Sequence, residues 1–487
     1  EDVPDQLVEL IESAYAEQGA LAGDRDTGIE GGDAPEGPFD PDAPVVPEDL
    51  DAPFDMDAPA EAYEPQTLAG SILGEDLPEP NVAEPTDYLS WVNSFTETEG
   101  RSAVPYYQAA TDHYIEFEGD AELRSAAVKG DPDALDSPEV REWLDANQAA
   151  IADFRDGNQF EYNGLELQSE NGDLIGALLP HLSQYRGLTR ALVTDGRRML
   201  ADGDTAGALD AYVDAITAGQ QAARGQTLID SLVGISMQAI GTYALLDAFD
   251  SAGDDVDYGQ LAARMEPVHR PMRPLTELVQ FERSMFMDTA QRLFEIDPAT
   301  GKPVVTRESL ERFDVRAFVG DSEPDADTTQ QFIELDFDQT RQAADEFYDS
   351  VTRALELPFP QQSAAFDEIE QGIQDHSNPL LRTMLPSLSR VSFLTARGQA
   401  GRRGAELVTN LRAYQQQFGE LPDSLEVFGE REFTVDPFTG GRFRYIRDGD
   451  SFRLYSTGGN GVDDGGVHDP RGEQNDYVIW PRPKKDD

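Results

Sequence analysis

The clearest candidate for chemistry is a segment after Tyr455 that is rich in hard oxygen ligands and in glycine. The oxygen-bearing side chains are those of Asn460, Asp463, Asp464, Asp469, Asn475 and Asp476. Calcium takes about six to eight oxygen ligands, and the interleaved glycines let backbone carbonyls turn inward to supply some of them. The sequence therefore predicts a calcium site, although the spacing is not that of an EF-hand loop. The alternative is an Asp- and Gly-rich surface loop of a generally acidic protein.

A local basic stretch is the second candidate site. No acidic residue occurs between Ser377 and Ala405, where the chain carries Arg382, Arg390, Arg397, Arg402 and Arg403. In so acidic a chain, this stretch predicts a docking surface for the acidic N-terminal segment or for a neighbouring protein. The alternative is a helix whose arginines pair with acids elsewhere in the body.

No complete catalytic motif is present. Gly320-Asp321-Ser322 resembles the nucleophile segment of Gly-Asp-Ser hydrolases, but no Asp-x-x-His follows it. The five histidines are too scattered for a metal-binding pair, and the chain has no Gly-rich phosphate loop. We therefore expect a non-enzymatic protein. A hydrolase built on unpatterned carboxylates stays an alternative, because 95 acidic residues produce carboxylate pairs by chance.

The composition narrows the choice of partner. The net charge of −58 argues against nucleic acid or an anionic membrane as the partner, and it favours cations and basic protein surfaces. Such an acid surplus also fits adaptation to salt, where screening weakens self-repulsion. The absence of cysteine excludes disulfides, Cys-bound zinc and thiol nucleophiles.

The numbered chain begins at Glu1 without an initiator Met, which favours loss of a leader or membrane anchor. We therefore expect an exported protein that is extracellular, at the cell surface or periplasmic. The most apolar run, residues 228–249, is interrupted by Asp230 and other polar residues, so it predicts a buried helix. No transmembrane segment is expected in the numbered chain.

Residues 1–85 differ in composition from the rest of the chain. They hold 24 acidic residues, one basic residue and 12 prolines, a composition that does not bury enough apolar surface to fold alone. Repeated Asp-Ala-Pro triplets with aromatic residues between them favour an extended path with periodic anchors. We interpret this segment as an arm for self-association or partner binding, or as a solvated spacer.

The elements that position the candidate sites are mainly helical. Residues 86–320 predict a body of irregular helical hairpins, and residues 321–400 predict a second helical segment. Asp136-Ser137-Pro138 signals one helix start, and residues 294–306 predict a small hairpin. In the last unit, 401–487, two aromatic-rich runs flank Asp448-Gly449-Asp450 and predict a β-hairpin, to which residues 477–480 would add a third strand.

This last unit carries a family resemblance. The order of its short blocks resembles the C-terminal module of type II secretion major pseudopilins. The blocks are 405–414, 418–425, 436–440, 443–445, 454–461 and 463–466. The resemblance implies a helix that leads into a small sheet and a calcium-binding loop. The numbered chain departs from that family in lacking its N-terminal hydrophobic helix.

A second resemblance covers residues 87–480. The blocks 143–147, 178–182 and 226–235 look like those of a family of uncharacterised exported proteins from planctomycete-type bacteria. It implies a helical body ahead of the same tail, and it brings no activity. Together these features predict a mainly α protein with an acidic arm and a pseudopilin-like α+β module. The expected function is structural or assembly-related, and a peptide-binding or protein-binding helical-repeat module is the alternative.

Overall fold

The computed structural model describes residues 72, 75–96, 102–160, 164–177, 179–251, 256–265, 272–312, 326–384 and 388–482. This part of the chain is mainly helical, as the sequence predicts, with two small antiparallel sheets. Most of the acidic arm and the Gly320-Asp321-Ser322 block lie outside the described residues.

Short helices open the described chain, and their polar caps explain where they begin. Asp120, Asp131 and Ser137 each accept a backbone N–H of the first helical turn with the side chain. The last of these caps begins the helix predicted after Ser137. The helices are α2 (Tyr88–Asn93), α3 (Val104–His113), α4 (Ala121–Lys129), α5 (Pro132–Leu135), α6 (Pro138–Ala146) and α7 (Gln148–Gly157).

Three long helices form the centre of the molecule: α8 (Pro180–Ala201), α9 (Thr205–Ala222) and α10 (Leu228–Ser251). Helices α9 and α10 approach closely because glycines meet at their crossing. A Cβ on Gly234 would lie 2.4 Å from the backbone nitrogen of Ala223. Among the described residues, α10 alone has the length and composition of a membrane span, and 78% of that stretch is buried inside the fold. Helix α11 (Tyr258–Met265) follows.

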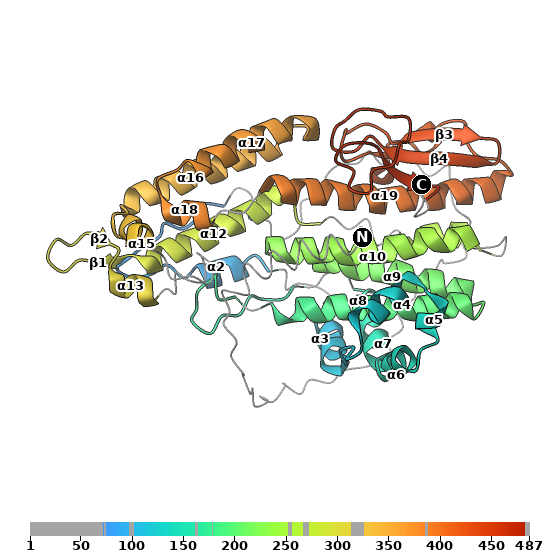
Figure 1. Ribbon diagram of the computed structural model, residues 1–487, viewed down its shortest axis with the longest axis horizontal. Helices are drawn as coiled ribbons and strands as arrows, with labels where there is room; N and C mark the ends of the chain where they lie inside the picture. Colours follow the sequence, from blue (N-terminus) through green and yellow to red (C-terminus); the bar gives the residue numbers. More distant parts are fainter. Residues whose placement is uncertain are drawn as a thin grey trace.

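A second group of helices packs around α12 (Leu275–Leu293). The predicted hairpin follows α12 as strands β1 (Glu295–Ile296) and β2 (Pro303–Val304), which project from one end of the molecule (Figure 1). The helices after it are α13 (Arg307–Arg312), α15 (Ala326–Ile333), α16 (Phe337–Leu355), α17 (Phe359–Gln374) and α18 (Pro379–Met384).

The longest described helix, α19 (Leu388–Phe418), leads into the C-terminal module (Figure 1). Two 3-10 turns, η2 (Leu425–Phe428) and η3 (Glu432–Thr434), precede strands β3 (Arg444–Asp448), β4 (Ser451–Ser456) and β5 (Tyr477–Trp480). The strands form one antiparallel sheet in the order β3-β4-β5, which packs on α19. This is the hairpin and third strand that the sequence predicts.

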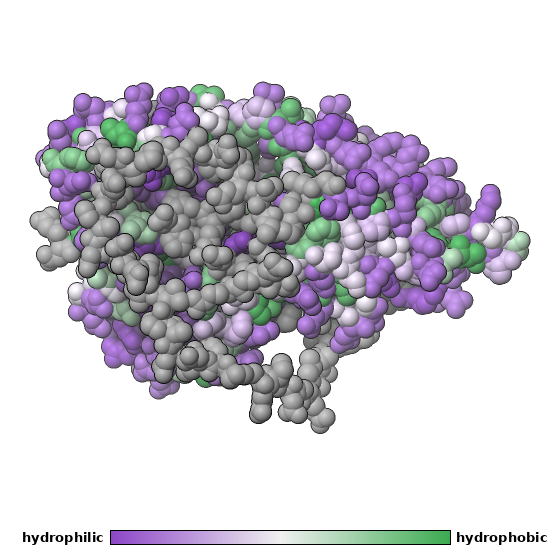
Figure 2. All heavy atoms as spheres, turned by 180° about the vertical axis from the view of Figure 1, so that it is seen from behind, coloured by the Kyte–Doolittle hydropathy of each residue, from purple (hydrophilic) through white to green (hydrophobic). Residues whose placement is uncertain are grey.

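Two hydrophobic cores lie along the molecule, and α19 contributes to both. One core gathers α3 to α11, most of α19 and the C-terminal sheet, and the other gathers α2, α12, α13 and α15 to α18. The two cores do not follow the unit boundaries expected from the sequence. Helix α12 of the 86–320 body shares its core with α16 of the 321–400 segment. The described surface that faces the viewer in Figure 2 is mainly hydrophilic, as the net charge requires.

Candidate functional site

The predicted calcium ligands lie in one long loop between β4 and β5, here named the Asp/Gly loop (residues 457–476). Glycine is required where the loop folds back on itself. Gly458 has φ +62°, and a Cβ there would lie 2.7 Å from the backbone carbonyl oxygens of both Gly472 and Asn475. Glycine therefore lets the chain pass close to two backbone carbonyl oxygens, and that of Gly472 accepts the N–H of Gly459 at 2.7 Å.

Asp476 is the most deeply buried of the predicted ligands, with no exposed surface. Its Oδ2 accepts the backbone N–H of Gly466 at 2.6 Å, while its Oδ1 is buried and has no hydrogen-bond partner among the described residues. Burial raises the pKa of Asp476, and the negative charges of Asp463 and Asp464 raise it further. Two backbone hydrogen bonds lower the pKa, but they offset only part of this rise. A buried carboxylate oxygen without a partner is a costly feature, and a cation would offset the cost.

Asp463, Asp464 and Asn460 lie on the more exposed side of the loop. Asp463 accepts the Tyr455 hydroxyl at 3.0 Å through Oδ1 and pairs with Nε of Arg444 at 3.1 Å through Oδ2. The side chain of Asn460 donates to Asp464 at 3.3 Å. The oxygens of Asp463 are therefore already engaged within the module.

The carboxylate of Asp469 is engaged in hydrogen bonds within the loop. Its two carboxylate oxygens accept the backbone N–H groups of Arg471, Glu473 and Gln474 at 2.8 to 2.9 Å. Burial alone would raise the pKa of Asp469, but these backbone donors hold it below its ordinary value. The carboxylate closes the turn at residues 469–474.

No group of three or more His, Asp or Glu side chains within the described ranges is gathered closely enough to hold a metal. The donors of the loop still fit calcium in kind, since they are carboxylate and carbonyl oxygens around one unsatisfied buried carboxylate. Asp476 would be the central ligand, with backbone carbonyls and waters completing the shell. The calcium site stays a prediction.

Two arginines of the basic stretch hold the Asp/Gly loop against α19. Arg390 forms an ion pair with Glu473, with 2.6 Å between Nη1 and Oε1. About two turns further along the helix, Arg397 donates to the carbonyl of Pro470 at 2.9 Å and lies over the ring of Tyr477. The helix therefore fixes both the loop and the start of β5.

The other arginines also have partners within the chain. Arg402 and Arg403 both reach Glu432 of η3 at 2.8 Å, and Arg403 also donates to a carbonyl of the module. Arg382 donates to Gln331 of α15 at 2.9 Å and to the carbonyl of His376. The sequence allowed two interpretations of this stretch: a docking surface, or a helix whose arginines pair within the body. The contacts among the described residues agree with pairing within the body.

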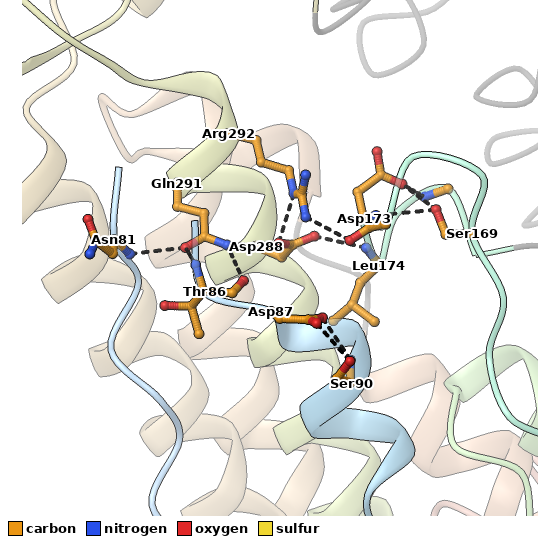
Figure 3. A network of polar contacts seen from close by, with 12 residues as sticks. Asn81, Thr86, Asp87, Ser90, Ser169, Asp173, Leu174, Asp288, Gln291 and Arg292 are labelled. Carbon is orange, nitrogen blue, oxygen red and sulfur yellow. Dashed lines mark hydrogen bonds and ion pairs between the residues drawn. The ribbon is translucent and has the colours of Figure 1, made fainter. Parts of the chain in front are cut away.

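The described end of the acidic arm contacts a different surface, on α12 (Figure 3). Gln291 accepts the backbone N–H groups of Asn81 and Thr86 at 3.0 and 2.9 Å and donates to the Thr86 carbonyl. Gln291 also donates to Asp288, which is 1% exposed. A surface pair between Glu79 and Arg341 of α16 lies beside this network.

Asp288 also joins a third segment to α12. Its Oδ1 accepts Nε of Arg292 at 2.9 Å, and its Oδ2 accepts the backbone N–H of Leu174 at 2.8 Å (Figure 3). The loop 164–177 is therefore bonded to Asp288 directly, and the arm end is connected to the same buried carboxylate through Gln291. No signal in the sequence separates Asp288 from the other acids of the chain.

The chain matches no protein-family model, no curated protein and no solved structure.

Proposed function

We propose that the chain is an exported, non-enzymatic structural or assembly protein whose C-terminal module is stabilised by calcium. The observation that carries the proposal is the buried Oδ1 of Asp476, which has no hydrogen-bond partner within the described part of the chain. When bound, calcium would neutralise this carboxylate and link separate parts of the Asp/Gly loop. The pseudopilin resemblance supports the same interpretation of the module.

The assembly role rests on the acidic arm. Its described end is fixed to the body by backbone N–H groups that donate to the side-chain oxygen of Gln291 and by the ion pair between Glu79 and Arg341. Ile72, 2% exposed, belongs to the same hydrophobic core as α12. The preceding acidic residues are therefore attached to the body at a fixed point. In this proposal they bind a basic surface of a partner or of a second copy.

Calcium binding is tested by thermal melting of the full chain with calcium, with magnesium and with chelator. We expect calcium to raise the melting temperature of the wild type and chelator to reverse the rise. Asp476→Asn, which keeps the shape and removes the charge, should lose the calcium-dependent shift. Asp450→Asn in the β3–β4 turn is the matched control and should keep it. A wild type that melts at one temperature in all conditions, or an Asp476→Asn shift equal to the wild-type shift, would remove calcium from the proposal.

Assembly is tested by deleting residues 1–70, which leaves Ile72 and the contacts of Asn81 in place. We expect the full chain to associate in sedimentation experiments at low salt, and the deletion to sediment as a monomer with an unchanged melting temperature. Association should weaken as salt screens the acidic arm. Equal association of the full chain and the deletion variant would contradict the role given to the arm.

A further inference from the structure

A small cavity lies between α10, α19 and β5, away from the Asp/Gly loop ligands. Its volume is about 20 Å³, and its polar lining comes from Thr242, Tyr243, Arg397, Arg402 and Tyr477. Aliphatic residues and two glycines of α19 complete the wall. Tyr243 and the glycines are half-buried, so the cavity opens toward solvent on that side. Its size suits one particle about as large as a water molecule.

Arg397 contributes a buried positive charge to this cavity. The residue is 6% exposed, and the guanidinium contacts the Pro470 carbonyl and the face of Tyr477. Among the described residues, no carboxylate lies within ion-pair distance of it. Burying an unpaired charge is expensive, and a carbonyl dipole and an aromatic face offset only part of the cost.

Arg402, the other arginine of the lining, differs from Arg397 in its partners. Arg402 and Arg403 share Glu432, and Arg402 lies 4.0 Å from Glu406. Arg402 therefore has carboxylate partners on α19 and η3, whereas Arg397 has none among the described residues.

Two of the three hydroxyl protons of the lining have no acceptor within the described part of the chain. Thr242 is 4% exposed, and its Oγ1 has no hydrogen-bond partner among the residues that the structure describes. The hydroxyls of Tyr243 and Tyr477 lie 3.1 Å apart and share one hydrogen bond, which leaves one of the two protons for another acceptor. Burial, together with Tyr243, raises the pKa of Tyr477 well above its ordinary value, so this proton stays in place.

We propose that the cavity binds one chloride ion, held by the Arg397 guanidinium and by the hydroxyls of Thr242 and of the tyrosine pair. Chloride would accept hydrogen bonds from Arg397, Thr242 and the free tyrosine proton, and it would cancel the charge of Arg397. Water would accept the same hydrogen bonds but would leave the charge uncompensated. A volume of about 20 Å³ favours a monatomic anion over sulfate or phosphate. The ion would join α10 to α19 and β5, and it acts independently of calcium.

The direct test is diffraction from crystals of the full chain grown in sodium bromide. Bromide replaces chloride and scatters anomalously, so we expect an anomalous peak between Arg397 and Thr242. A well-ordered water with no anomalous signal at that position would overturn the proposal.

The solution test compares melting temperatures in sodium chloride and sodium gluconate at equal ionic strength. Gluconate is too large for the cavity, so the wild type should melt higher in chloride, with a rise that saturates as the site fills. Thr242→Val keeps the volume and removes one donor, and Arg397→Gln removes the charge. Both variants should lose the difference between the two salts. Arg390→Gln, on the same helix but paired with Glu473, should retain it. Equal melting in the two salts for the wild type, or an undiminished difference in both variants, would refute the chloride site.

Discussion

Asp297 and Asp436 begin the same turn in two distant parts of the chain. Each heads an Asp-Pro-x-Thr-Gly sequence, residues 297–301 and 436–440. In each turn the Asp side chain accepts the N–H two residues on, at 2.9 and 3.0 Å, and the Asp carbonyl accepts the final Gly N–H, at 2.7 and 2.8 Å. The final glycines have φ of +68° and +70°.

Tertiary packing gives the two carboxylates opposite properties. Hydrogen bonds from Thr300 and the local backbone lower the pKa of Asp297, which lies in the projecting hairpin. Asp436 is 2% exposed and also accepts the Ser456 hydroxyl of β4, and burial raises its pKa. One local motif is therefore a surface turn in the hairpin and a core element in the C-terminal module.

Replacing Asp436 with Ala should lower the free energy of unfolding by about 2–3 kcal/mol, because the Ser456 hydroxyl and a backbone N–H would stay buried without acceptors. Asp297→Ala removes the same cap at the surface and should cost less. Urea unfolding of the two variants checks this order. Equal losses would mean that the local turn, and not its burial, sets the contribution.

Glu282 of α12 predicts a pH dependence of stability. Burial raises its pKa to about 7, although the carboxylate accepts the backbone N–H of Leu228 at the start of α10. Because the folded protein keeps this proton at pH values where the unfolded chain has lost it, stability should fall as pH rises from about 4.5 to about 7.

Glu282→Gln keeps the acceptor and removes the titration. The variant should be more stable than the wild type above pH 7, by at most about 3 kcal/mol, and the difference should shrink toward pH 4.5. Urea unfolding across this range measures it, with the exposed Glu346→Gln of α16 as the charge-matched control. A Glu282→Gln curve parallel to that of the wild type would contradict the assignment.

The buried pair of Arg273 and Glu277 predicts a large loss on removing its cation. The two groups are 2.8 Å apart, Glu277 has no exposed surface, and Arg273 also donates to the carbonyl of Gly225 between α9 and α10. Arg273→Met should cost about 3–5 kcal/mol in the free energy of unfolding, because a buried carboxylate loses its cation. Arg312→Met, which breaks an exposed pair with Glu295, should cost less than about 1 kcal/mol. Similar losses in chemical denaturation would show that the buried pair is well solvated.

The crossing of α9 and α10 makes a prediction about glycine. Gly234→Ala would place a Cβ against the backbone of α9, so we expect a loss of about 1–3 kcal/mol from overpacking. Gly372→Ala in α17 meets nothing within 4 Å and should stabilise the protein by about 0.5–1 kcal/mol. Melting curves of the two variants should move in opposite directions. A shift in the same direction would show that the helices separate to accommodate the methyl group.

The local elements could be predicted from the sequence because their signals are local. Ser137 caps α6 by accepting the N–H of Val140, and Gly449 takes the positive φ that the turn from β3 to β4 requires. The hairpin after α12 was predictable for the same reason. The mainly helical class follows from many such signals along the chain.

The partners of charged residues depended on the tertiary structure, because they are distant in sequence. Nothing near Arg390 indicates Glu473, and nothing near Gln291 indicates Asn81. Burial is equally non-local, as the opposite pKa shifts of Asp297 and Asp436 show in one repeated turn. The sequence by itself determined where helices and turns begin, and only the packing of distant segments decided which charges are buried and what neutralises them.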